Sequence, residues 1–251
     1  MPARSSRTTR WIPEKEGSVQ SLFGNMSSTE LLLVVLNFLL MIPALVLHEL
    51  AHGWVAYRLG DTTAKRAGRL SLNPLKHIDP FGTLLMPAML FFFTSALGGR
   101  AFAFGYAKPV PINPNNFRDR RKGILLTGIA GPVMNILLAI GSSILYLAVY
   151  LMNPTHSAGS VLGVIGLLLY QFAFINLMFA FFNLIPIPPL DGSRVLQYFL
   201  PRSALHFYAQ LERWGFIILI AVMWLTPLFT WYINATAGSL MNLLPMLVGL
   251  G

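Results

Sequence analysis

Two histidines and a glutamate near residue 50 have the spacing of a zinc site. They are His48, Glu49 and His52, in the order H-E-x-x-H. Residues four apart on a helix share one face, so both imidazoles can bind the same Zn²⁺ ion. The glutamate can then act as general base toward a water molecule that the metal activates. These residues predict hydrolytic chemistry at one zinc ion per chain.

A third metal ligand must come from elsewhere, because a catalytic zinc site usually has three protein ligands and one open position. We expect Asp191, since it ends a stretch, 123–190, that contains no Asp, Glu, Lys or Arg. Prolines at positions 186, 188 and 189 precede it. Irregular backbone at membrane depth is tolerated only where it is buried in protein or lines a polar cavity. The alternative is a solvated turn just past the end of a helix.

The composition is that of a membrane protein. Of the 251 residues, 55% are hydrophobic and 11% charged, whereas soluble domains have about 25% charged residues. These values exclude an ordinary soluble domain and a disordered chain, and the lack of cysteine excludes a disulfide scaffold. A glutamate inside an apolar helix costs several kcal/mol, so Glu49 marks a candidate functional site.

We therefore predict an all-α polytopic membrane protein with five or six apolar segments. They are 31–47, which continues as helix to Arg58, and then 81–97, 123–152, 161–185, 216–233 and 240–250.

The region between the first segment and the central pair is basic and less regular. Segment 81–97 either spans the membrane or is re-entrant. Alternating residues and prolines over 101–111 predict a short extended or β segment that is associated with the membrane. As domains, we expect a polar basic tail at 1–29, a core at 30–215, and one or more membrane segments at 216–251.

Three motifs, in this order, resemble the site-2 protease family of intramembrane zinc metalloproteases. The first is the H-E-x-x-H motif, the second is Gly131-Pro132-x-x-Asn135, and the third runs from Asn183 through two prolines to Asp191-Gly192. The resemblance covers approximately residues 31–215. Segment 68–80 is similar to the compact bacterial and archaeal branch, and no inserted PDZ-like domain is visible.

The resemblance implies roles for individual residues. His48, His52 and Asp191 would bind zinc, and Glu49 would activate water. Asn135 and Asn183 would hold the substrate strand or stabilise the oxyanion, although both could instead make interhelical hydrogen bonds. The substrate would be a transmembrane protein that is cut in or near its membrane segment. It would unwind along an edge near residues 109–113.

Positive charge predicts the orientation. The net charge is +9, which in a soluble protein would suggest nucleic-acid binding, but in a membrane protein basic loops mark the cytoplasmic side. His48 and Asp191 must meet, so the regions 58–80, 98–122 and 188–214 share one side, with 14 of the 18 basic residues. We expect a multi-pass cell-membrane protein with a cytoplasm-facing active site and no nucleic-acid partner. The basic N-terminal tail conflicts with this orientation, and the sequence leaves the oligomeric state open.

Two other functions remain. A membrane metal or ion transporter also carries ionisable groups in its spans, but its ligands should be distributed over several spans, and it needs no glutamate between two histidines. A proteolytically inactive regulatory homologue would usually have lost Glu49 or a metal ligand.

Overall fold

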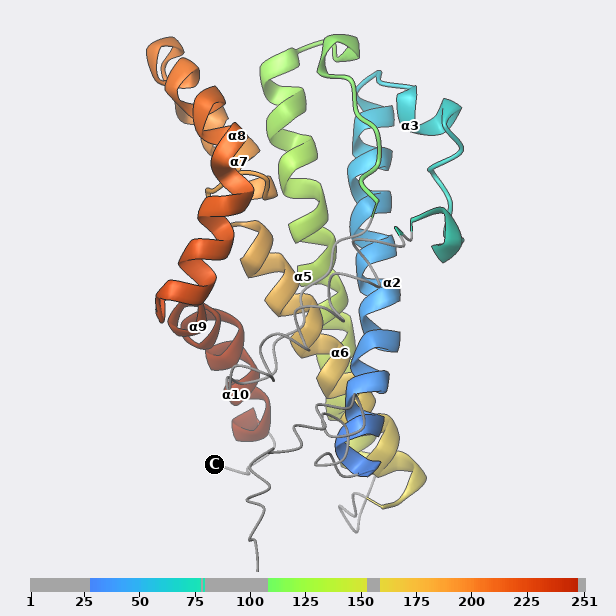
Figure 1. The fold of residues 1–251 in the computed structure, drawn as a ribbon. Helices are drawn as coiled ribbons and strands as arrows, with labels where there is room; N and C mark the ends of the chain where they lie inside the picture. The colour runs from blue at the N-terminus through green and yellow to red at the C-terminus, as the bar shows by residue number, and fades with distance from the viewer. Residues whose placement is uncertain (1–27, 78, 80–107, 153–158, 248–251) are drawn as a thin grey trace, which may run out of the picture.

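The computed structural model describes residues 28–77, 79, 108–152 and 159–247 (Figure 1). All regular structure within these ranges is helical. The helices are α2 (Ser28–Arg58), α3 (Thr63–Arg66), η1 (Pro74–Lys76), η3 (Pro114–Asn116), α5 (Arg120–Met152), α6 (Val161–Asn183), α7 (Asp191–Phe199), α8 (Arg202–Leu225), α9 (Leu228–Ile233), the π-helical η4 (Asn234–Gly238) and α10 (Ser239–Leu247).

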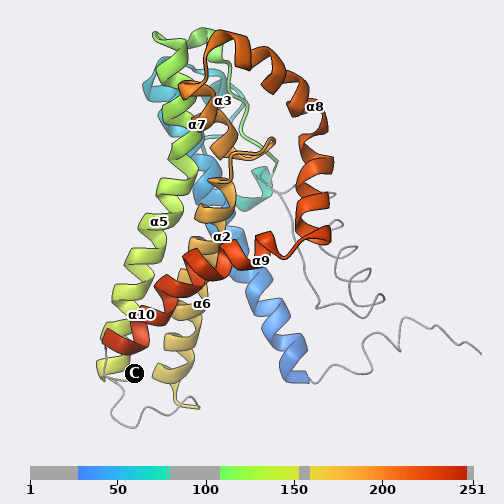
Figure 2. The same cartoon turned by 90° about the vertical axis from the view of Figure 1, so that its left-hand side faces the viewer.

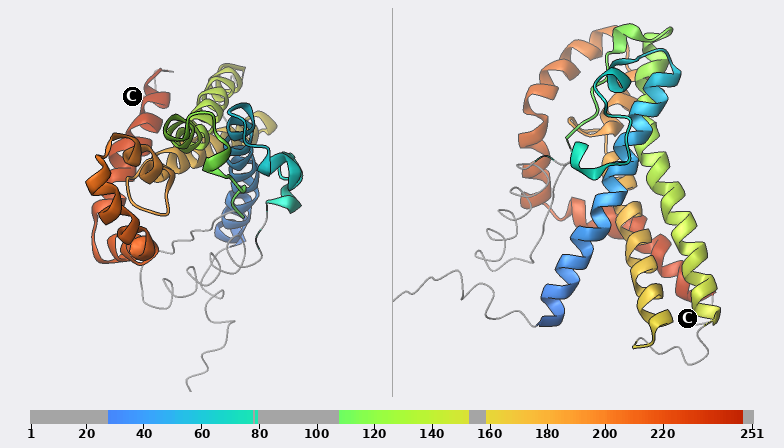
Figure 3. Two further views of the ribbon diagram at one scale, coloured as in Figure 1. Left: turned by 90° about the horizontal axis from the view of Figure 1, so that it is seen from above. Right: turned by 90° about the vertical axis from the view of Figure 1, so that its right-hand side faces the viewer.

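Helices α2, α5 and α6 are long and apolar enough to cross a membrane. The predicted helix from 31 to Arg58 and the central pair are confirmed. Helix α5 packs against both other helices, and α2 diverges from α5 toward its N-terminal end (Figure 3). The 33 residues of α5 give a length of about 50 Å, whereas the hydrocarbon core is about 30 Å thick. Helix α5 therefore extends beyond the hydrocarbon core.

The C-terminal helices form a bent unit beside this bundle (Figure 2). Helix α8 ends at Leu225, and the chain turns by 82° before it continues through α9, η4 and α10. Pro227 lies in the break. Proline has no N–H for a helical hydrogen bond and disfavours helical backbone angles in the residue before it, so it ends a helix. The sequence predicted a break between segments 216–233 and 240–250, whereas the structure has its break inside the first of them, between α8 and α9.

The predicted number of spans is not confirmed. The described residues contain three candidate spans, or four if the bent pair is counted as one. Segment 81–97 and residues 101–107 lie outside the described residues. Residues 108–113 form a stretched segment without regular structure (Figure 1), which ends in the extended backbone of Asn113, but the described part of the chain has no β-strand.

Two apolar clusters hold the helices together. The larger joins α5 and α6 to the C-terminal helices through residues such as Ala139, Leu177 and Leu219. The smaller, Ala44, Ile175 and Phe179, joins α2 to α6. Helix α7 packs against α5, which brings its first residue, Asp191, to the bundle.

Candidate metal centre

His48, His52 and Asp191 meet in the interior. The two histidines lie on one face of α2, and their Nε2 atoms are 3.0 Å apart. Oδ2 of Asp191 lies 3.1 Å from each Nε2 atom, and all three residues are buried. The structure therefore brings together the three residues that the sequence suggested as ligands, and they form a group that could hold a metal ion.

The other nitrogen of each imidazole is already used. Nδ1–H of His48 donates to Oδ1 of Asn135 at 2.5 Å, and Nδ1–H of His52 donates to the carbonyl oxygen of Thr127 at 2.6 Å. Because both acceptors are oxygens, each neutral ring has its proton on Nδ1 and its lone pair on Nε2. Two lone pairs and a carboxylate oxygen thus converge, an arrangement that a cation stabilises.

The dimensions suit zinc. A tetrahedral zinc ion with bonds of about 2.0–2.1 Å requires ligand atoms roughly 3.3 Å apart. The observed separations of 3.0 to 3.1 Å are close to three corners of that tetrahedron. Imidazole nitrogens with one carboxylate oxygen are also a typical donor set for catalytic zinc.

Glycines on α5 leave the space for this centre. A Cβ atom built on Gly131 would lie 2.5 Å from Nε2 of His48 and closer still to Nε2 of His52, the two nitrogens that would hold a metal. One turn earlier, a Cβ atom at Gly128 would lie 3.3 Å from the backbone oxygen of Asp191. Helix α5 can approach α2 and α7 this closely because both positions lack a side chain.

Glu49 points toward the extended segment 108–113. Its Oε2 atom accepts a hydrogen bond from the backbone N–H of Val110 at 2.9 Å. Arg69 holds the start of the segment, since its guanidinium donates to the carbonyl oxygen of Lys108 at 2.6 Å. The candidate base and the extended segment are therefore in direct contact.

Asp61 secures the end of that segment, and the sequence reasoning missed it. Its fully buried carboxylate accepts hydrogen bonds from the backbone N–H of Asn113 at 2.7 Å and from the amide of Asn116 at 2.8 Å. It also accepts hydrogen bonds from the backbone N–H and the hydroxyl of Thr63, the first residue of α3. Burial alone would raise the pKa of Asp61, but these hydrogen bonds outweigh it and hold the pKa below its ordinary value of 3.8. The sequence Gly60-Asp61-x-Thr63 predicts a turn. It does not show that Asp61 bonds to Asn113 and Asn116, which lie 52 and 55 residues further along the chain.

The two asparagines suggested by the resemblance have different surroundings. Asn135 is fully buried. Its amide oxygen accepts the hydrogen bond from His48, and its amide nitrogen donates to Oδ1 of Asn176 at 2.8 Å. Asn183 ends α6, and its amide donates to the carbonyl oxygen of Phe179 at 3.0 Å. A direct role of either residue on substrate stays a prediction.

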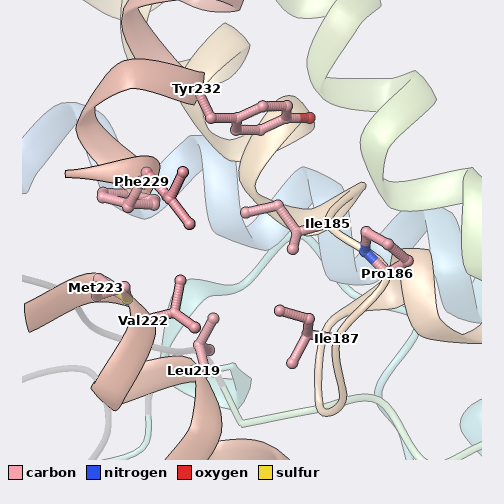
Figure 4. A pocket seen from close by; sticks show the side chains of 9 residues that line it. Ile185, Pro186, Ile187, Leu219, Val222, Met223, Phe229 and Tyr232 are labelled. Atoms are coloured by element: carbon pink, nitrogen blue, oxygen red, sulfur yellow. The ribbon is translucent and has the colours of Figure 1, made fainter. Parts of the chain in front are cut away.

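The C-terminal helices hold the loop that leads to Asp191. Three loop residues, Ile185 to Ile187, line an apolar cavity of about 210 Å³, and residues of α8 and α9 such as Leu219 and Phe229 form its other side (Figure 4). Tyr208 donates to the carbonyl oxygen of Pro186 at 2.9 Å. The position of Asp191 therefore depends on α8 and α9 as well as on α5.

Comparisons with known proteins agree with this site. The profile of peptidase family M50 matches residues 154–226. A Bacillus subtilis protein provisionally named zinc metalloprotease YwhC is 37% identical over 212 residues, which are 81% of this chain and 88% of that protein. The similarly named Rip2 of Mycolicibacterium smegmatis is 31% identical over 80% of this chain and 70% of its own length, and Rip2 of Mycobacterium tuberculosis H37Rv is 29% identical over 75% and 66%. No solved structure matches.

Proposed function

Since this chain belongs to peptidase family M50, the site-2 protease family of intramembrane zinc metalloproteases, we propose that it hydrolyses peptide bonds in or near the transmembrane segments of other membrane proteins. This is the cleavage step of regulated intramembrane proteolysis. The protein is a multi-pass membrane enzyme with a zinc cofactor.

The metal ligands in this proposal are His48, His52 and Asp191. Their mutual distances of 3.0 to 3.1 Å support this assignment. A zinc ion held by these residues would supply polarisation of the scissile carbonyl and a lower pKa of the attacking water. Asn135 and the carbonyl of Thr127 keep both imidazoles in the tautomer that binds metal.

Glu49 acts as the general base. It is half-buried next to the two histidines of α2, and its carboxylate can take a proton from the attacking water and give it to the leaving amine. The hydrogen bond from Val110 fixes one of its oxygens, so less reorganisation is needed when the proton moves.

The substrate pairs with segment 108–113. Helical peptide bonds are shielded by their own hydrogen bonds, so a substrate helix must unwind to an extended strand before it is cut. Val110 directs its N–H toward Glu49. In an extended chain the neighbouring residues face the opposite edge. These neighbours, Pro109 and Pro111, have no N–H and offer only carbonyl acceptors there, and the carbonyl oxygen of Pro109 also accepts a long hydrogen bond of 3.4 Å from Arg69. We assign this edge to the substrate and keep Asn135 and Asn183 as candidate substrate contacts.

The active site faces the cytoplasm. The C-terminal end of α2 and the N-terminal ends of α5 and α8 lie at the same end of the bundle (Figure 1). The basic regions 58–80 and 98–122 adjoin these ends, and an excess of Lys and Arg is typical of the cytoplasmic side.

Hydrolysis is favoured over metal transport. Within the described ranges, metal-ligating side chains form one compact group of three, whereas a transport pathway needs sites at successive depths.

The triangle of ligand atoms beside Glu49 carries the proposal, and the Glu49→Gln variant tests it. The enzyme should be purified in detergent and incubated with a tagged single-span reporter protein. We expect cleavage to fall by at least 100-fold, because loss of a general base typically costs 10²–10⁴-fold, while zinc content stays at one ion per chain. Glu212→Gln, which changes an exposed glutamate on α8, is the matched control and should cleave normally. Unchanged cleavage by Glu49→Gln would show that Glu49 is not the base.

A further inference from the structure

We propose that Asn176 is a positioning residue for the metal centre, acting through Asn135 to fix the imidazole of His48. The inference rests on the proposed role of His48 as a zinc ligand. It assigns a role in metal binding to α6, a helix that contributes none of the three proposed ligands.

The contacts form a chain with one direction. Nδ1–H of His48 donates to Oδ1 of Asn135, and Nδ2 of Asn135 donates to Oδ1 of Asn176 at 2.8 Å. Nδ2 of Asn176 donates to the carbonyl oxygen of Phe172 at 2.8 Å in its own helix. Each amide oxygen accepts and each amide nitrogen donates. The carbonyl of Phe172 is fixed in the helix and can only accept, so it determines the orientation of the amide of Asn176, and through it the orientations of Asn135 and of His48.

This direction determines which nitrogen of His48 can bind metal. If Asn176 presented its nitrogen to Asn135, two donors would face each other, and Asn135 would have to turn its own nitrogen toward His48. Nδ1 of His48 would then have to accept, and the ring proton would move to Nε2, which faces Asp191 and His52. A protonated Nε2 cannot bind zinc. Asn176 therefore favours the tautomer that the metal requires.

Burial makes the chain effective. Asn135 and Asn176 have no exposed surface, so their amides satisfy each other within the protein. Asn135 has one further contact, at 3.5 Å to the carbonyl oxygen of Ala44. That distance is too long for a strong bond, which leaves Asn176 as the main partner that orients Asn135.

A second amide pair in the same bundle provides a control. Nε2 of Gln171, also on α6, donates to Oδ1 of Asn37 on α2 at 2.7 Å. Both pairs connect α6 to another helix through one side-chain hydrogen bond, but only Asn176 leads to His48. A purely structural role predicts similar effects from the two pairs, whereas positioning predicts a difference in metal affinity.

The experiment compares Asn176→Leu with Gln171→Met in the full chain, purified in detergent. Zinc affinity is measured by competition with a chromogenic chelator, the ligand field by the visible absorption of the Co²⁺-loaded protein, and stability by thermal unfolding. We expect Asn176→Leu to weaken zinc binding by about 10 to 100-fold and to change the Co²⁺ spectrum. Gln171→Met should lower the unfolding temperature by a similar amount while zinc affinity stays within about twofold.

Two further variants keep the outcome decisive if Asn176→Leu does not fold. In Asn176→Ser the serine hydroxyl can donate to a carbonyl of its own helix, but the side chain is too short to reach Asn135. This variant should therefore also bind zinc weakly. Asn176→Asp, in its protonated form, keeps an oxygen acceptor toward Asn135 and an O–H donor toward the carbonyl of Phe172, and it should restore most of the affinity.

Normal zinc affinity in both Asn176→Leu and Asn176→Ser, with only the unfolding temperature lowered, would overturn the positioning role. His48→Ala distinguishes this failure from a failure of the proposed function. If His48→Ala also keeps its zinc, the ligand assignment itself is wrong. If it loses zinc, only the inference about Asn176 fails.

Discussion

Gly131 gives the most direct test of the metal centre, because the structure defines what a single methyl group would displace. In Gly131→Ala the new carbon would lie 2.5 Å from Nε2 of His48. Ordinary contacts of carbon with a heavy atom are about 3.5 Å, so the overlap is roughly 1 Å. The methyl group is attached directly to the backbone and cannot rotate away, so the two imidazoles must move.

A displacement of this size should abolish most of the activity. Misplacing a catalytic group by about 1 Å can cost 10²-fold in rate, which corresponds to about 2.7 kcal/mol of transition-state stabilisation. Overpacking a tight interior adds about 1–3 kcal/mol of destabilisation. We expect kcat/KM for a single-span reporter to fall by at least 100-fold, and zinc per chain, measured by elemental analysis, to fall well below one.

Two other glycines on α5 give a graded series. A Cβ atom at Gly128 would lie 3.0 Å from Cβ of Arg194 and 3.3 Å from the backbone oxygen of Asp191, so Gly128→Ala should cause an intermediate loss by shifting α7. Gly141 has no neighbouring atom within 4 Å, and Gly141→Ala should retain full activity. If Gly131→Ala keeps its zinc and cleaves within about twofold of the unmodified enzyme, no metal lies between the two imidazoles, and the geometric reasoning is refuted.

Three further predictions follow from the contacts of the site. Asp191→Ala should lose stoichiometric zinc, because two histidines are too few ligands for a stable site; elemental analysis that still finds one ion per chain would remove Asp191 from the ligands. Val110→Pro removes the N–H that Glu49 accepts and should lower the cleavage rate while zinc content is unchanged; loss of zinc would instead indicate a general structural defect. Asp61→Asn should destabilise the fold by about 1–3 kcal/mol at neutral pH, because its buried acceptors lose their charge. The pKa of Asp61 is lowered in the folded state, so its contribution to the free energy of unfolding is complete above the ordinary value of 3.8 and is lost as the pH falls through the lower pKa of the folded state. The difference in unfolding temperature between Asp61→Asn and the unmodified protein should therefore disappear only in that acidic range. A difference that stays constant with pH would show that the charge of Asp61 is not its cause.

The three proposed metal ligands could be singled out in the sequence because their signals are local. The spacing of His48 and His52 has meaning on a helix, and Asp191 stands out after a long uncharged stretch. The three long helices were predictable for the same reason, since runs of apolar residues determine them. The structure adds that the ligand atoms of these residues lie within hydrogen-bonding distance of one another.

The supporting residues could not be predicted because their partners are far away in the chain. Asn176 is one of three amide side chains in an otherwise largely apolar helix, and its proposed role depends on the register in which α6 packs against α5. In the sequence Asp61 is an ordinary turn residue, and only the folded structure shows its hydrogen bond with Asn113. The bend at Pro227 was missed for another reason, since an apolar run does not show the angle at which its two halves meet.

His48 and Asp191 are 143 residues apart in the chain, and this separation bears on how the enzyme is made. At typical rates of 5–20 residues per second, about 7–30 s pass between the synthesis of the two ligands. During this interval α2, α5 and α6 can enter the bilayer, but the nascent chain has only two of the three proposed metal ligands. With Asp191 as the third ligand, proteolytic activity would begin only after α7 has docked, and the order of synthesis would keep an unfinished protease from cutting the proteins that are being inserted beside it.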